Sequence, residues 1–172
     1  MELYEGLLTR RSVRNFKPDA VPGELLEKIA EAGLYAASGM GRQGTRILQI
    51  TDPALRDRLM RMNAAIMGRE GTDPFYGAPA VFVVLADKAI PTAIYDGSLV
   101  MGNLMLAAHA FGLGSCWIHR AKEEFESEEG KAILASLGVE GDYEGIGHCV
   151  VGYSAEADKE RAARRPGRIV RA

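Results

Sequence analysis

Apolar residues recur at the spacing of an amphipathic helix in several stretches of the chain. Leu3, Leu7 and Leu8 show this spacing near the N-terminus, and a longer run of the same kind follows Pro22, a residue type favoured in the first turn of helices. A later stretch is rich in small and apolar residues and stops at Gly112. The pattern therefore predicts helices over residues 2–9, 22–36, 53–67, 93–111 and 123–137.

Strand-like patterns lie between these helices. Residues 46–51 alternate between apolar and polar, whereas residues 80–86 are continuously apolar, which is typical of an interior strand. Short apolar runs at 115–118 and 147–153 complete the set. Helices that alternate with about four or five short strands indicate an α/β-like or α+β protein, with one sheet covered by helices on both faces.

Length and composition indicate one compact domain over residues 1–172. Hydrophobic residues make up 47% of the chain and charged residues 26%, and 172 residues are enough for one hydrophobic core but not for two. The net charge of −2 offers no overall field for nucleic acid or an anionic membrane. No apolar run has the length of a membrane span, and the N-terminus lacks the order of a signal peptide. Cys116 and Cys149 lack metal-ligand spacing. We therefore expect reduced thiols, no metal site and a cytoplasmic location.

The segment between the first two predicted helices carries the clearest candidate for ligand binding. Residues 10–21 have no apolar period and place Arg10, Arg11 and Arg14 around Ser12. The planar guanidinium group binds phosphate oxygens in pairs, and a hydroxyl can complete the shell. This segment is thus either a phosphate site or a solvated basic turn.

The glycine-rich segment 38–44 matches neither a phosphate-binding P-loop nor a dinucleotide fingerprint. Its glycines would let backbone N–H groups approach a ligand, and Gln43 offers an amide that both donates and accepts. The alternative is an ordinary connector.

No arrangement of acid, base and nucleophile is evident in the sequence. His109 and His148 fall in apolar surroundings, where satisfied structural histidines are expected, whereas His119 ends a short strand at a rim position. The serines and cysteines show no protease or hydrolase signature. A protein of this kind can delegate its chemistry to an organic cofactor.

Six short motifs, in order along the chain, resemble those of the nitroreductase-like flavoproteins. They are 10–16 (RRSVRNF), 37–43 (ASGMGRQ), 77–79 (GAP), 96–108 (DGSLVMGNLMLAA), 112–118 (GLGSCWI) and 151–153 (VGY). The resemblance implies an α+β fold with a central, mostly antiparallel sheet flanked by helices, in an intertwined homodimer with FMN at the subunit interface. It also implies ping-pong transfer of hydride from NAD(P)H to a nitroaromatic, a quinone or a related small-molecule acceptor.

The same resemblance assigns roles to the basic segment. Arg10 and Ser12 would hold the FMN phosphate, with Arg11 close by. Arg14 would approach the pyrimidine edge of the flavin ring, where a cation stabilises negative charge on the reduced ring and raises its reduction potential. No side chain is implied as an acid or base, because the chemistry takes place on the flavin.

Further cofactor contacts are implied from two other segments. Ser38 and Gln43, in the glycine-rich loop, would reach the flavin or its ribityl chain from the partner subunit. Trp117, Ile118 and His119 would lie along the ring, near its N5 and O4 atoms. A last phosphate contact would come from the basic tail, through Arg164 or one of its neighbours Arg161, Arg165 and Arg168.

The chain departs from the family pattern in the glycine-rich loop. Gly41 stands where an Asn is usual, and Gly44 and Thr45 replace Pro-Trp, so one side-chain contact to the flavin is missing. This departure leaves open a flavin- or nucleotide-binding carrier or sensor without turnover. Reductive dehalogenation and oxidative flavin breakdown are further alternatives. Because the chain is short, residues 62–76 are expected to wall the substrate pocket.

Overall fold

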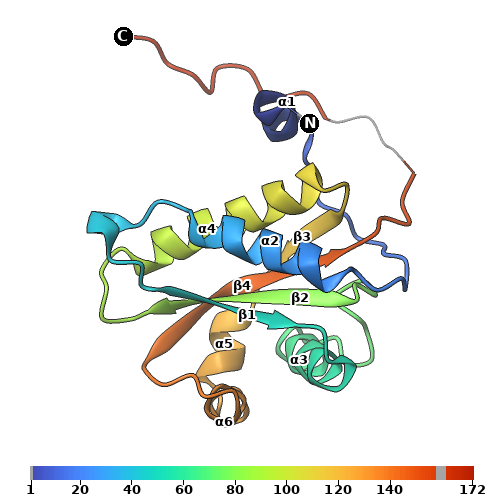
Figure 1. Ribbon diagram of the computed structural model, residues 1–172, viewed down its shortest axis with the longest axis vertical. Helices are drawn as coiled ribbons and strands as arrows, with labels where there is room; N and C mark the ends of the chain where they lie inside the picture. The colour runs from blue at the N-terminus through green and yellow to red at the C-terminus, as the bar shows by residue number, and fades with distance from the viewer. Residues whose placement is uncertain (1, 158–161) are drawn as a thin grey trace.

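The computed structural model describes residues 2–157 and 162–172. In this part of the chain a four-stranded sheet has the order β1-β2-β4-β3, and each neighbouring pair is antiparallel (Figure 1). The strands are β1 (Thr45–Ile50), β2 (Ala80–Asp87), β3 (Gly114–Ile118) and β4 (Tyr143–Gly152). The antiparallel pairing confirms the α+β class.

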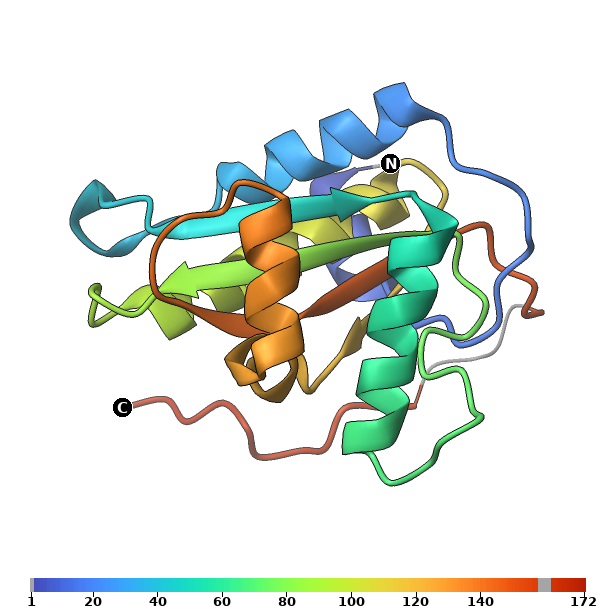
Figure 2. The same ribbon diagram turned by 90° about the horizontal axis from the view of Figure 1, so that it is seen from below.

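Helices cover both faces of the sheet, as the sequence predicts. One face carries α2 (Gly23–Leu34) and α4 (Ala93–Ala110). The other face carries α3 (Pro53–Ile66), α5 (Ala121–Glu126) and α6 (Glu128–Ser136) (Figure 2). The short N-terminal helix α1 (Leu3–Thr9) stands away from both layers and contacts α4 (Figure 1).

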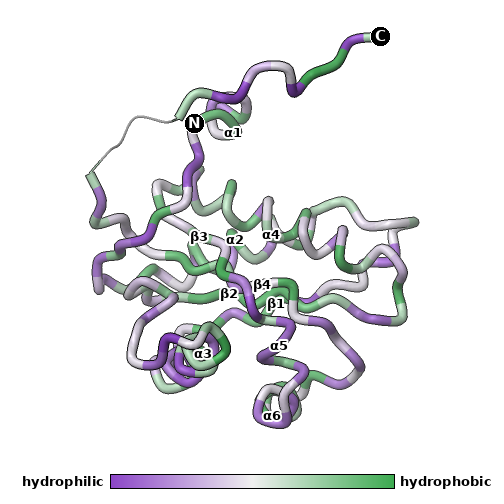
Figure 3. Tube along the Cα trace, turned by 180° about the vertical axis from the view of Figure 1, so that it is seen from behind, coloured by the Kyte–Doolittle hydropathy of each residue, from purple (hydrophilic) through white to green (hydrophobic). Residues whose placement is uncertain are grey.

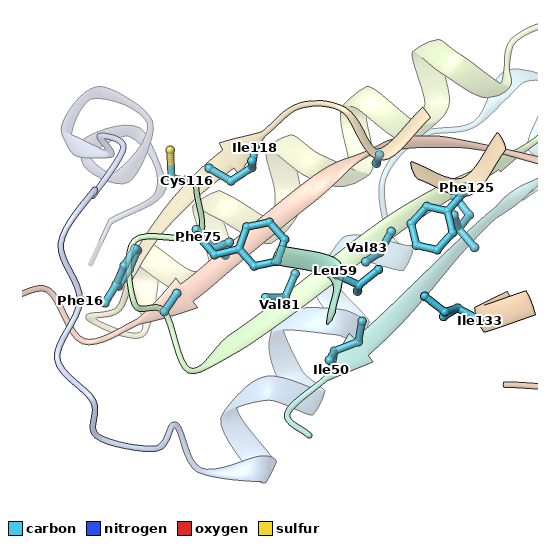
Figure 4. Close-up of a cluster of buried hydrophobic side chains, with 14 of the residues drawn as sticks. Phe16, Ile50, Leu59, Phe75, Val81, Val83, Cys116, Ile118, Phe125 and Ile133 are labelled. Atoms are coloured by element: carbon cyan, nitrogen blue, oxygen red, sulfur yellow. The ribbon is translucent and has the colours of Figure 1, made fainter. Parts of the chain in front are cut away.

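Strand β2 divides the core into two clusters. Val81 and Val83 face the layer of α3, α5 and α6, where they pack with Leu59 and Phe125 (Figure 4). Phe82 faces the layer of α2 and α4. Both faces of the strand are therefore buried, at about 1.5 to 3 kcal/mol for each large side chain. This burial explains why residues 80–86 are continuously apolar and confirms the prediction of an interior strand.

The prediction of one helix over 123–137 is wrong, because the chain forms α5 and α6 with a break at Ser127, whose ψ is 157°. The Ser127 hydroxyl donates to the Glu124 carbonyl at 2.6 Å and accepts from Gly130 N–H at 3.0 Å, so it caps α6. A Cβ on Gly130 would lie 2.0 Å from the Glu124 carbonyl oxygen. The apolar periodicity continues across the break and conceals it.

The last strand is longer than predicted, because β4 begins at Tyr143 and not at residue 147. Its extra residues pair with the end of β2 beyond a shift in register at Val84/Leu85. Gly147 interrupts the apolar pattern of this strand. A glycine is needed there because a Cβ atom would lie 2.4 Å from Trp117 Nε1. The remaining predicted elements are present, with their ends shifted by a few residues.

Beyond β4 the described tail has no regular element, and its apolar residues Ile169 and Val170 are exposed (Figure 3). Across residues 2–157 and 162–172, none of the helices has the length and hydropathy of a membrane span.

Candidate functional site

The segment between α1 and α2 is fastened along the edge of the sheet. Ser12 forms a parallel bridge with Ser115 of β3, and Val13 N–H donates to the Ser115 carbonyl at 2.9 Å. Phe16 bridges the chain just after β4. Val13 and Phe16 are buried, while Arg14 between them is exposed. Anchoring of the apolar residues, among them Phe16 (Figure 4), thus fixes the backbone of the segment that carries the basic residues.

A cleft of about 330 Å³ opens beside the end of β3. Trp117, Ile118 and His119 line it from the strand end, and Arg14 lines it from the fastened segment. Residues between 67 and 76, in the loop from α3 to β2, contribute to its lining as well. The structure therefore brings these predicted residues into one cavity, and of residues 62–76, which are expected to wall the substrate pocket, it places only residues from 67 onward beside the cleft.

Arg10 and Ser12 are not among the residues that line the cleft, but both act on the thiol of Cys116, which does line it. Burial raises the pKa of the Cys116 thiol, while the charge of Arg14, a hydrogen bond with Ser12 and the charge of Arg10 lower it in part. Arg10 Nη1 is buried and has no hydrogen-bond partner among the residues that the structure describes. A buried guanidinium N–H without a partner is unfavourable, so this donor favours an anion.

Arg11 contacts the chain beyond β4 instead. Its Nη2 donates to the Ala157 carbonyl at 3.1 Å. It lines a neighbouring cavity of about 270 Å³ together with Ser115 and Glu156. Arg11 is thus close to the cleft along the chain, but it is not among the residues that line it.

Ser38 and Gln43 belong to the turn between α2 and β1, near the start of α4. Ser38 Oγ accepts from Gln43 N–H at 3.2 Å, and Gly39 N–H donates to the Asp96 carboxylate at 3.1 Å. Gln43 is exposed and has a φ of 50°, a left-handed conformation. Neither residue lines the cleft of its own chain.

Arg164 lies exposed in the irregular tail and is not among the residues that line the cleft. The competing candidates Arg165 and Arg168 are also exposed in this tail. Arg161 lies outside the described residues.

A buried polar cluster behind the cleft was not predicted. Asn63 of α3, Glu124 of α5 and His148 of β4 are each fully buried. Asn63 Nδ2 donates to Glu124 Oε1 and, at 2.8 Å, to the His119 carbonyl, while Asn63 Oδ1 accepts from Arg120 Nε at 2.9 Å. The cluster therefore ties the interior to His119 and Arg120, which line the cleft. The one signal in the sequence is an Asn four residues after Leu59, on an apolar helix face.

The expectation of a satisfied histidine is wrong for His148. Its Nε2 lies 3.1 Å from Glu124 Oε2, but this approach is not aligned as a hydrogen bond, and Nδ1 has no partner within the described part of the chain. The ring lies 5.1 Å from that of Phe75 and 6.4 Å from that of Phe125. His109 differs, because its Nε2 lies 2.8 Å from Thr9 Oγ1 and links α4 to α1.

The chain is similar in sequence to two archaeal proteins. A putative NADH dehydrogenase/NAD(P)H nitroreductase of Methanothermobacter thermautotrophicus is 26% identical over 121 residues, which cover 68% of this chain and only 60% of the relative. A protein of the same name from Archaeoglobus fulgidus is 29% identical over 143 residues, covering 80% of this chain and 77% of the relative.

Among solved structures, a nitroreductase with bound FMN from Bacteroides fragilis superposes with a TM-score of 0.90 at 26% identity, covering 100% of this chain and 99% of the other. The model of the Nitroreductase family matches residues 7–153, a span that includes β1 to β4 and every residue that lines the cleft. The chain therefore belongs to the nitroreductase family.

Proposed function

We propose that this protein is an FMN-dependent oxidoreductase that passes hydride from NAD(P)H to nitroaromatic, quinone or related acceptors in ping-pong order. The observation that carries the proposal is the cleft in which Arg14 meets the end of β3, in a chain of the nitroreductase family. The structurally similar B. fragilis protein holds FMN, and the names of the archaeal relatives point to NAD(P)H as the reductant.

The residues present fit FMN. Arg10 has a buried N–H that lacks a partner among the described residues, and Ser12 adds a hydroxyl, so both suit phosphate oxygens. Arg14 lines the cleft and supplies positive charge for the electron-rich edge of the ring. Residues 117–119 would cover one side of the ring and keep water from it. FMN, when bound, supplies the hydride chemistry for which the side chains of the cleft have no group.

We also propose that two copies of the chain form a homodimer that shares the cofactor. Ser38 and Gln43 do not line the cleft of their own chain, so they would reach the flavin only from a second copy. Large apolar side chains are exposed on α1 and near the start of α4, as expected of an interface. They are Leu3, Tyr4, Leu7, Leu8, Ile94, Tyr95 and Leu99.

Titration with FMN tests the cofactor assignment. We expect the purified chain to bind FMN and quench its fluorescence, and the Arg10→Gln/Arg14→Gln double variant to bind it at least about tenfold more weakly, because two charge-assisted contacts are lost. Arg58→Gln is the matched control, since Arg58 pairs with Glu129 on the exposed side of α3. Equal FMN affinity of the double variant and the control would refute the assigned site.

Anaerobic mixing of the FMN-loaded protein with NADH or NADPH tests turnover. Rapid bleaching of the flavin absorbance, followed by recovery on addition of a nitroaromatic or a quinone, supports the enzyme. Parallel lines in double-reciprocal plots support ping-pong order. Bound FMN that neither nicotinamide bleaches would favour the carrier or sensor suggested by Gly41.

A further inference from the structure

The cleft is strongly cationic. Three guanidinium groups line it, those of Arg14, Arg69 and Arg120, against the single carboxylate of Asp73. Asp73 is already engaged, because its Oδ2 lies 2.7 Å from Arg56 Nη2 and its oxygens accept backbone N–H groups of the following turn. The charge of the cleft is therefore not balanced by its own residues.

The Arg120 side chain is held in place from the interior. Its Nε donates to Asn63 Oδ1 at 2.9 Å, and Asn63 is itself fixed by the buried Glu124. Arg120 adopts a φ of 79°, a conformation uncommon for any residue other than glycine and one that often accompanies function. This anchor uses the Nε–H of the guanidinium, and the terminal Nη groups are the donors that suit an anion.

Neither Arg69 nor Arg120 has a carboxylate within ion-pair distance in the described part of the chain. Arg120 also borders a neighbouring cavity that Glu123 and Glu144 line, but Glu144 is paired with Lys122 at 3.2 Å and neither carboxylate is within ion-pair distance of Arg120. Arg14 is assigned to the flavin above. Two cations thus remain for something other than the cofactor.

We propose that Arg69 and Arg120 form an anion-binding site that selects a second substrate carrying a carboxylate or a phosphate, an inference that rests on the proposed function. Guanidinium groups that line one cleft bind such groups through charge-assisted hydrogen bonds. The anion belongs either to the acceptor, as a carboxylate, or to the nicotinamide, as the extra phosphate of NADPH. Asn63 acts as a positioning residue for Arg120.

The test uses the FMN-loaded protein and para-nitrobenzoate, with para-nitrobenzyl alcohol as its neutral counterpart. We expect Arg69→Gln and Arg120→Gln each to raise both the Kd and the KM for para-nitrobenzoate about tenfold, and to change those for the alcohol less than about twofold. The Kd comes from perturbation of the oxidised flavin spectrum, so it is independent of turnover. Arg120→Lys should recover part of the loss because it keeps the charge, and Arg58→Gln should resemble the wild type.

A second arm identifies the source of the anion. If the phosphate of NADPH occupies the site, the two variants lower kcat/KM for NADPH about tenfold and leave that for NADH nearly unchanged. Either arm supports the inference. Variants that keep the wild-type preference both for para-nitrobenzoate over the alcohol and for NADPH over NADH would overturn the inference and leave the FMN assignment standing. A wild type that fails to hold FMN would overturn both proposals.

Discussion

Replacement of Glu124 by Ala should destabilise the protein severely. The Glu124 side chain is fully buried, and its two oxygens face Asn63 Nδ2 and His148 Nε2. The substitution leaves both nitrogens without their carboxylate and opens a cavity between α5 and β4. Each buried polar group left without its partner costs about 1 to 3 kcal/mol, and the cavity adds to this cost, so the free energy of unfolding should fall by about 3 to 5 kcal/mol. For a chain of this size, that corresponds to a decrease in Tm of about 6 to 20 °C.

The assay is thermal unfolding of the FMN-saturated protein, followed by far-UV circular dichroism at one fixed protein concentration, because ligand and self-association both shift Tm. Glu123→Ala is the matched control, since Glu123 is the preceding residue on the same helix and is exposed; it should change the free energy of unfolding by less than about 0.5 kcal/mol. Glu124→Gln should fall between the two, because it keeps an acceptor for Asn63. A Tm for Glu124→Ala equal to that of the control would refute the energetic role assigned to the buried cluster.

Three further outcomes are expected. Arg14→Gln should lower the reduction potential of bound FMN by about 30 mV or more, measured by redox titration; an unchanged potential would contradict the placement of Arg14 beside the ring. Leu7→Ser/Leu8→Ser should shift the protein from dimer to monomer in sedimentation, and a dimer that persists would place the interface elsewhere. Burial raises the pKa of the Cys116 and Cys149 thiols, so alkylation at neutral pH should be far slower in the native protein than in the unfolded one. The unfolded thiols ionise near their ordinary pKa of 9.0, whereas the native thiols stay protonated there. Their contribution to the free energy of unfolding is therefore complete below that pH and declines above it. The Cys149→Ala variant should show a smaller decline.

Much of the fold was predictable because its signals are local. The buried strand 80–86 and the helix over 53–67 follow from apolar patterning, and both are present. The break at Ser127 escaped prediction because it depends on one hydroxyl and on the close packing of Gly130. Periodicity reports which side of a segment is apolar, and both short helices present the same side.

The site was predictable only as far as the motifs extend. They identified Arg14 and residues 117–119, which do line one cleft. Arg69 stands in an irregular loop and carries no local signal of its role. Asn63 and Glu124 come from helices far apart in the sequence, so their contact is a property of the packed core.

The bridges at Ser12 and Phe16 have a consequence for biosynthesis. Residue 12 can pair only after Ser115 has been synthesised, and residue 16 only after Ser154, so the segment between α1 and α2 docks long after it leaves the ribosome. Until then Arg10, Arg11 and Arg14 have neither β3 to dock against nor the cleft that forms beside it. The nascent polypeptide would consequently become competent to capture a flavin only after β3 and β4 have been synthesised, and a product truncated before β3 would hold none.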